Sequence, residues 1–159
     1  MSQIQVGIGD YAVSANPTEE LKTYALGSCV AVLIYDKLQK VAAMMHIALP
    51  DSEVNPGKAQ QMPGYFADTG IPRLLSKMKS HNAKRHSIWI KLIGGSNIMD
   101  ENRRFDIGKR NVLAIKKLLW KYQLDTVAED IGGGISRTVS ISVESGEVLI
   151  SSGPKKWTL

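Results

Sequence analysis

The sequence contains few of the residues from which catalytic and metal-binding sites are usually built. Among its 159 residues there is 1 cysteine, Cys29, and there are 3 histidines. A single cysteine excludes an intrachain disulfide and a CxxC metal site, and it favours a reducing cytoplasm in which the thiol stays reduced. No pattern of nearby carboxylates accompanies the histidines, so we expect no metal site.

Long hydrophobic runs are also absent. The longest apolar stretches, residues 30–34 and 41–45, are far shorter than the roughly 20 residues that a membrane-spanning helix needs. The first residues, MSQIQVGIGD, have neither the basic region nor the apolar region of a secretory signal. We therefore expect a cytoplasmic protein without direct membrane insertion. The length predicts one domain, residues 1–159, that is large enough to bury a proper core.

Acidic residues are scarce in one part of the chain, although the net charge is only +5. Between Arg73 and Lys121 there are thirteen lysines or arginines and three acidic residues. This segment indicates either a face that binds an acidic partner or two helices whose outer surfaces are solvated. Nucleic acid is not expected as a partner, because the basic residues are not interleaved with exposed aromatics and no zinc-finger or RNP pattern occurs.

Hydrophobic periodicity predicts many short strands and two helices. Apolar runs predict strands near residues 3–8, 10–14, 21–26, 29–35, 41–49, 87–93, 126–130, 137–143 and 147–152, of which the first two are expected to pair nearby. Helices are predicted at 65–81 and at 107–122, the second capped by Asp106, with a loop at 50–64. The pattern is typical of an α/β protein of the α+β type. We expect a single compact domain with a mixed, largely antiparallel β-sheet and two main flanking helices.

Cys29 by itself is most simply interpreted as a small apolar residue in a core, and His46 as a satisfied core histidine. Their spacing adds a second interpretation. If residues 29–35 and 41–49 form a hairpin around a turn at 37–38, Cys29 lies directly opposite His46 on the same face. A slip of one residue would instead turn His46 to the other face. A neighbouring imidazole stabilises the reactive thiolate, so this register predicts a nucleophile paired with a base.

Seven blocks of the sequence together resemble one family. They are GIGDYAV at 7–13, LGSCVAV at 26–32, MMHIALPDS at 44–52, ADT at 67–69, IGGS at 93–96, IGKRNV at 107–112 and AEDIGG at 128–133. Because the blocks occur in order over nearly the whole chain, the sequence resembles the bacterial chemoreceptor glutamine deamidases, the CheD family. The GSC corner followed by the histidine block is the most specific of these features.

The resemblance implies a thiol deamidase with a papain-like cysteine–histidine pair and a fold similar to that of toxin-type glutamine deamidases. It places the nucleophile at Cys29, the base at His46 and a third, orienting member at Thr23. The implied substrates are glutamine side chains on the cytoplasmic helices of chemoreceptors, which are converted to glutamate during adaptation of chemotaxis. The resemblance implies no cofactor.

Small residues are predicted to complete the site as an oxyanion and substrate rim. They are Gly27, Ser28, Gly94, Gly95 and Ser96. The backbone N–H of Cys29 is the candidate oxyanion donor, and the missing side chains of the glycines let a substrate helix approach closely. The alternative is that these residues form plain tight turns. Asn111 and Arg137, which lie in or near other blocks, are interpreted as groups that brace loops.

A function of a different class stays open. The resemblance also implies binding to a response-regulator phosphatase of the chemotaxis system, so the alternative is a regulatory module that docks on this phosphatase and on receptors, with catalysis secondary. Docking requires neither Cys29 nor His46, whereas catalysis requires both. A third interpretation, a structural domain with a buried thiol, predicts that native Cys29 resists alkylation.

Overall fold

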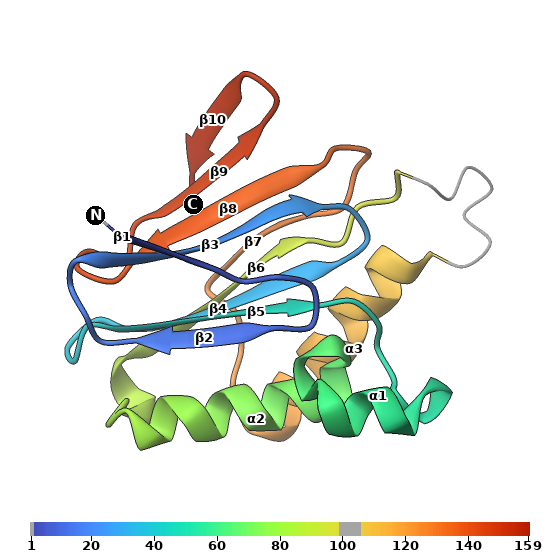
Figure 1. Cartoon of the computed structure of the whole chain (residues 1–159), viewed down its shortest axis with the longest axis horizontal. Coiled ribbons are helices and arrows are strands. Elements are labelled where there is room, and N and C mark those ends of the chain that lie inside the picture. The colour runs from blue at the N-terminus through green and yellow to red at the C-terminus, as the bar shows by residue number, and fades with distance from the viewer. Residues whose placement is uncertain (1, 99–105) are drawn as a thin grey trace.

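Two β-sheets lie face to face, and the helices cover the outer face of one of them (Figure 1). This arrangement comes from a computed structural model, which describes residues 2–98 and 106–159. The first sheet contains β1 (Ser2–Gln5), β3 (Glu19–Leu26), β8 (Arg137–Ser142), β9 (Val148–Ser152) and β10 (Lys155–Thr158), in that order. The second contains β2 (Tyr11–Ser14), β5 (Val41–Ile47), β4 (Val30–Asp36), β6 (Ile88–Gly94) and β7 (Ala128–Ile131). The helices are α1 (Pro56–Gln61), α2 (Ala67–Ser80) and α3 (Ile107–Lys121).

Both sheets are mixed but mainly antiparallel. β1 runs parallel to β3, and β6 runs parallel to β7, whereas every other pair of neighbouring strands is antiparallel. The α+β class and the largely antiparallel pairing predicted from the sequence are therefore confirmed. The strands divide between two sheets, because the central strands β4 and β5 are covered on both faces and need a second layer on each side.

Alternate residues of β4 face two different cores. Ala31, Leu33 and Tyr35 pack into the core between the sheets, together with residues of β3 and β8. Val32 and Ile34 face the other way, into the core beneath α2 and α3. Because side chains alternate along a strand, this parity also directs the residues just before β4. Cys29 accordingly packs against the core between the sheets.

Several local predictions differ from the structure. The first two strands do not pair with each other, because the N–H of Val6 extends β1 along β3 while the N–H of His46 binds Asp10 beside β5. The predicted loop at 50–64 contains α1, and the strand β10 was missed. Asp106 precedes α3 but makes no side-chain cap, since its backbone is left-handed with φ 43°.

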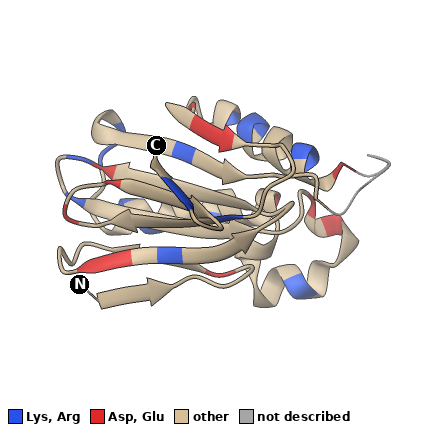
Figure 2. Cartoon of the chain, turned by 90° about the horizontal axis from the view of Figure 1, so that it is seen from above, with Lys and Arg blue, Asp and Glu red and all other residues tan. Residues whose placement is uncertain are grey.

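The basic residues of the central segment lie mainly on the exposed sides of α2 and α3. Arg73, Lys77 and Lys79 are exposed on α2, and Lys109, Arg110, Lys117 and Lys121 are exposed on α3. Figure 2 shows the opposite side of the molecule, where basic and acidic positions are interspersed on the strands. Among the described residues no helix is long and apolar enough to cross a membrane.

Candidate active site

Cys29 lies in the corner between β3 and β4, half-buried against the core between the sheets. The segment that follows β6 holds this corner from one side. The N–H of Ser96 donates to the carbonyl of Gly27 at 2.8 Å, and the N–H of Gly95 donates to the carbonyl of Cys29 at 2.9 Å. The predicted rim residues 94–96 are therefore in direct contact with the corner that carries the thiol.

Asn111 of α3 holds the same corner from below. Its side-chain amide donates to the carbonyls of Ser28 and Ala48, both at 3.0 Å, and the side chain is fully buried. In a trans peptide the C=O and the next N–H point in opposite directions, so the N–H of Cys29 points away from Asn111. It lies beside the sulfur of its own residue and acts to lower the pKa of the thiol.

Gly94, the last residue of β6, lies directly against the thiol corner. Its φ is 117°, and an added Cβ would lie 2.3 Å from the carbonyl oxygen of Cys29. We expect Gly94→Ala to lower the free energy of unfolding by roughly 2 kcal/mol through backbone strain and this overlap. Gly133 is the matched control, because its φ is also positive, at 70°, but a Cβ there meets nothing within 4 Å.

Gly133→Ala should therefore cost only about 1 kcal/mol, from the left-handed backbone alone. Urea unfolding of both variants followed by circular dichroism gives the two values. Equal losses would show that the approach of Gly94 to the Cys29 carbonyl has no energetic consequence.

Arg137 at the start of β8 fixes the two glycine-containing loops relative to each other. Its guanidinium donates to the hydroxyl of Ser96 at 2.7 Å, to the carbonyl of Gly132 at 3.0 Å and to Asp130 at 2.9 Å. The side chain is only 5% exposed, so these charge-assisted bonds are shielded from water. The bracing role expected for Arg137, and that of Asn111 above, are confirmed.

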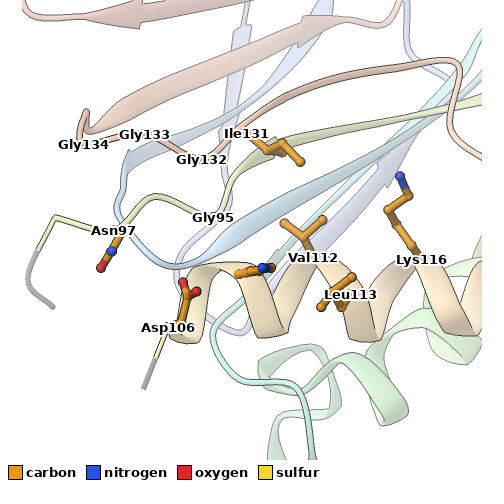
Figure 3. A pocket seen from close by; sticks show the side chains of 11 residues that line it. Gly95, Asn97, Asp106, Val112, Leu113, Lys116, Ile131, Gly132, Gly133 and Gly134 are labelled. Atoms are coloured by element: carbon orange, nitrogen blue, oxygen red, sulfur yellow. The ribbon is translucent and has the colours of Figure 1, made fainter. Parts of the chain in front are cut away.

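An open hollow of about 680 Å³ lies between these loops and α3 (Figure 3). Gly95 and residues 132–134 line its upper side, and Val112 and Leu113 of α3 line the lower side. A Cβ added at any of positions 132–134 would meet nothing within 4 Å. The glycine loops thus border open space on the α3 side of the second sheet, and their role as a substrate rim stays a prediction.

His46 lies on β5 and points into the space between the sheets. Its ring nitrogen Nδ1 is 2.7 Å from the hydroxyl of Thr23, which comes from β3 in the other sheet. That hydroxyl also lies 2.6 Å from the carbonyl of Val6. A carbonyl can only accept, so Thr23 donates its one proton to Val6 and must accept from Nδ1–H of His46. This assignment leaves Nε2 unprotonated, with a lone pair that can take up a proton.

The environment of His46 keeps its ring neutral. The side chain is 2% exposed, and burial lowers the pKa of His46 to about 4, although the negative charge of Asp10 acts in the opposite direction. Within the described part of the chain, Nε2 is buried and has no hydrogen-bond partner. A buried acceptor without a donor is costly, and functional sites are where such atoms are retained.

The thiol is also held in its neutral form. Burial raises the pKa of Cys29, and the hydrogen bond from its own N–H only partly opposes this. Both shifts favour a neutral thiol beside a neutral imidazole. These shifts run against a preformed thiolate in the free protein, and the pairing of Cys29 with His46 stays a prediction.

The predicted register of the β4–β5 hairpin is wrong by two residues. His46 lies opposite Ala31, and the same register places Cys29, one residue before β4, opposite Ala48. Two residues is a whole period of a strand, so Cys29 and His46 still share a face. They are diagonal neighbours, for which backbones are about 7–8 Å apart and a long side chain can still reach across.

Asp36 is the reason for the changed register. It closes the hairpin opposite Val41, so the loop is residues 37–40, and Lys40 takes a left-handed φ of 53°. The buried carboxylate accepts hydrogen bonds from the backbone of Leu38, Gln39 and Lys84 and from the hydroxyl of Ser87. These four bonds hold the pKa of Asp36 below its usual range against the effect of burial, and they fix the end of the strand.

The chain is similar over its whole length to proteins of one family. Residues 48–152 match the family described as CheD chemotactic sensory transduction. A protein of Syntrophotalea carbinolica named "Probable chemoreceptor glutamine deamidase CheD" is 48% identical over 162 residues, with 100% of each chain covered. The chain belongs to the CheD family. "Chemoreceptor glutamine deamidase CheD" of Thermotoga maritima is 41% identical over 91% of this chain and 88% of its own.

Family membership does not depend on the candidate pair. The match to the CheD family begins at residue 48, after both Cys29 and His46. The match to the Syntrophotalea protein covers the whole chain and therefore spans both positions. A further CheD relative, from Methanococcus maripaludis, is 36% identical over 98% of this chain and 99% of its own. The resemblance recognised from the seven sequence blocks is thus confirmed, and the geometry of the thiol and imidazole is a separate observation.

One member of the site could not be found from the sequence. The carbonyl of Val6 decides the direction of the Thr23 hydrogen bond, yet a backbone carbonyl leaves no mark on residue type. Thr23 itself was assigned only through the family resemblance, since a threonine in a strand is ordinary. The structure places its hydroxyl 2.7 Å from Nδ1 of His46 across the two sheets.

Proposed function

We propose that this CheD-family chain hydrolyses the side-chain amide of glutamine residues on chemoreceptors in the cytoplasm, and so adjusts receptors during adaptation. The observation that carries the proposal is the buried, unpartnered Nε2 of His46, which the Thr23 bond keeps unprotonated on the face it shares with Cys29. The names of the full-length relatives support the same reaction and the same class of substrate.

In the proposed first step, Cys29 attacks the amide carbon of glutamine while Nε2 of His46 takes the thiol proton. A C–S bond forms, and the amide oxygen becomes an oxyanion that accepts from the N–H of Cys29. His46 then returns the proton to the amide nitrogen, the C–N bond breaks, and ammonia leaves a thioester on Cys29.

In the proposed second step, His46 removes a proton from a water molecule that attacks the thioester. The C–S bond breaks, the proton returns to sulfur, and glutamate is released. Because burial shifts the pKa values of both groups toward their neutral forms, proton transfer accompanies the attack instead of preceding it. Rotation of the Cys29 side chain toward Nε2 is the motion that this requires, and catalytic hydrogen bonds of this kind often tighten only when substrate binds.

Thr23 acts in this scheme as the group that sets the tautomer of His46. Thr23→Val removes the oxygen that accepts from Nδ1 and leaves a side chain of similar shape. We expect the rate of deamidation to fall by about 10- to 100-fold, because the ring is no longer held with Nε2 unprotonated. Thr23→Ser keeps the hydroxyl and should retain most of the activity. Ammonia release measured for both variants gives the comparison, and equal losses would exclude this role of the hydroxyl.

Mass spectrometry of chemoreceptor cytoplasmic fragments incubated with the protein tests the proposed function directly. The expected result is a gain of about 1 Da at individual glutamines, with no change after incubation with Cys29→Ala. Unchanged glutamines in every receptor fragment would refute the proposal. This experiment does not test docking on a response-regulator phosphatase, because docking uses neither the thiol nor the imidazole. That docking stays a prediction.

A further inference from the structure

The carbonyl groups of the thiol corner, those of Gly27, Ser28 and Cys29, all accept hydrogen bonds. Those of Gly27 and Cys29 accept from backbone N–H groups of the segment that follows β6. The carbonyl of Ser28 instead accepts from the side-chain amide of Asn111 at 3.0 Å. The orientation of the Ser28–Cys29 peptide therefore depends on a side chain, and a single substitution can release it.

The N–H of this same peptide is the candidate oxyanion donor. The peptide is planar and trans, so the N–H of Cys29 points away from the carbonyl that Asn111 holds. It lies beside the sulfur of Cys29, where it lowers the pKa of the thiol. A rotation of the peptide that released the carbonyl from Asn111 would also turn the N–H away from the sulfur.

Asn111 uses both hydrogens of its amide nitrogen in this place. Nδ2 also donates to the carbonyl of Ala48 at 3.0 Å, two residues after His46, and the side chain is fully buried. Its oxygen Oδ1 is buried as well and has no hydrogen-bond partner within the described part of the chain. A buried acceptor without a partner lowers stability, so the gain from this amide lies in the two carbonyls that it holds.

Helix α3 gives Asn111 a rigid support beneath the corner. Its first turn packs against the segment that follows β6, since a Cβ added at Gly108 would lie 2.4 Å from the carbonyl oxygen of Gly95. Val112 and Ile115 of the same helix are buried in the core beneath the second sheet. The helix therefore fixes the amide of Asn111, and the amide fixes the peptide.

We propose that Asn111 is a positioning residue for deamidation, which holds the Ser28–Cys29 peptide with its N–H directed at the oxygen of the bound glutamine amide. The inference rests on the proposed reaction of Cys29. The amide oxygen gains negative charge as the C–S bond forms, so a donor directed at it stabilises the transition state more than the bound substrate. Asn111 acts through the peptide and does not contact the reacting atoms.

Asn111→Leu tests this role, because leucine is of similar size and has no hydrogen to donate. For ammonia release from a receptor fragment, we expect kcat to fall by about 10- to 100-fold and KM to change by about threefold or less. Wild-type kcat in this variant would overturn the role of Asn111.

Tyr35→Phe is the matched control, because Tyr35 is also a buried side chain that donates to backbone carbonyls. Its hydroxyl lies 2.9 Å from the carbonyl of Val143 and 3.2 Å from that of Glu144, at the other end of β4 from the thiol corner. The control should lose stability but keep kcat within about twofold of the wild type. A fall in kcat as large as that of Asn111→Leu would show that lost stability is the cause, and it would overturn the role.

Alkylation of Cys29 by iodoacetamide separates a turned peptide from a general distortion of the corner. Alkylation forms no oxyanion, but it requires the thiolate, which the N–H of Cys29 stabilises. In Asn111→Leu the pH of half-maximal alkylation rate should therefore rise, while the maximal rate at high pH changes by about twofold or less. Tyr35→Phe should keep the wild-type profile. An unchanged midpoint in Asn111→Leu would show that the N–H stays in place without the amide, contrary to the proposal.

A measurement on the wild-type protein tests the same role if Asn111→Leu does not fold. A receptor peptide with an aldehyde in place of the glutamine amide group adds to Cys29, so that a C–S bond forms and the thiol proton passes to the aldehyde oxygen. When this oxygen accepts from the N–H of Cys29, the Ser28 carbonyl becomes a stronger acceptor for Asn111, since linked hydrogen bonds strengthen one another. The NMR signals of the Cys29 amide proton and the Asn111 Nδ2 protons should move downfield together. A Cys29 signal that moves without the Asn111 signals would overturn the role.

The outcome is separable from that of the proposed function. Deamidation by the wild type, with full activity in Asn111→Leu, would remove the role of Asn111 and leave the reaction in place. No deamidation of any receptor fragment by the wild type would refute the proposed function and with it a role of Asn111 in that reaction. The alkylation midpoint needs no receptor, so it shows in either case whether Asn111 holds the peptide.

Discussion

Cys29→Ala should remove deamidation completely, with a fall in ammonia release of about a thousandfold or more. The chain has no second thiol that could take over the attack. The half-buried side chain loses one sulfur atom, so the free energy of unfolding should change by roughly 1 kcal/mol or less. Ammonia release from a receptor fragment and a urea unfolding curve of the same protein measure the two effects.

His46→Ala should produce a loss of activity as large as that of Cys29→Ala, because the thiol and the imidazole act as one unit. His81→Ala is the matched control, since His81 is exposed at the C-terminal end of α2, where its ring contacts the carbonyl of Lys77. The control should keep full activity. Substantial residual activity in either Cys29→Ala or His46→Ala would refute the assignment of the pair.

The stability of the protein should depend on pH through His46. Its pKa is about 4 in the folded chain, below the value of 6.5 for an exposed histidine, because burial disfavours the charged ring. Between these two values the unfolded chain binds more protons than the folded one. The free energy of unfolding is therefore highest above about pH 6.5, and it decreases as the pH falls toward 4.

A shift of this size corresponds to roughly 3 kcal/mol. His46→Gln removes the titrating group and should remove this part of the pH dependence. The difference in free energy of unfolding between wild type and variant, measured in urea from pH 7 to pH 4, isolates His46 from carboxylates such as Asp36, which contribute equally to both proteins. A constant difference over this range would contradict the buried, neutral ring.

The same pKa predicts the acid limb of the enzyme's pH profile. His46 must be unprotonated to take the thiol proton, so kcat/KM should rise with pH through about 4 and not through 6.5. The profile should then be level around neutral pH. Burial raises the pKa of Cys29, so its thiolate forms only at a pH above that at which a thiol usually ionises. An acid limb near 6.5 would show that the ring is solvated when it acts.

Local sequence patterns were sufficient for the helices and for the face on which the two reactive groups lie. The apolar period placed α2 and α3 to within a few residues, and the strands predicted at 137–143 and 147–152 are β8 and β9. Cys29 and His46 share a face for any register that differs by an even number of residues, so the error of two residues did not affect that conclusion.

What could not be predicted depends on groups that are distant in sequence. Asp36 sets the register through the backbone of Lys84 and the hydroxyl of Ser87, which come from the connection between α2 and β6. Asn111 joins the segments on which the thiol and the imidazole are carried, through Ser28 and Ala48. No periodicity in the sequence encodes these contacts, because each needs two elements to be packed together first.

The sequence by itself determined the class of fold, the family and the two residues that can carry the chemistry, because strand period and residue type are local properties. Only the tertiary structure decided the surroundings that shift the pKa values of those residues. Thr23 and Val6 reach His46 from the opposite sheet and fix its tautomer, and burial between the sheets keeps both ring and thiol neutral. Hydrogen bonding and desolvation arise from neighbours in space, so they appear only when the two sheets are brought face to face.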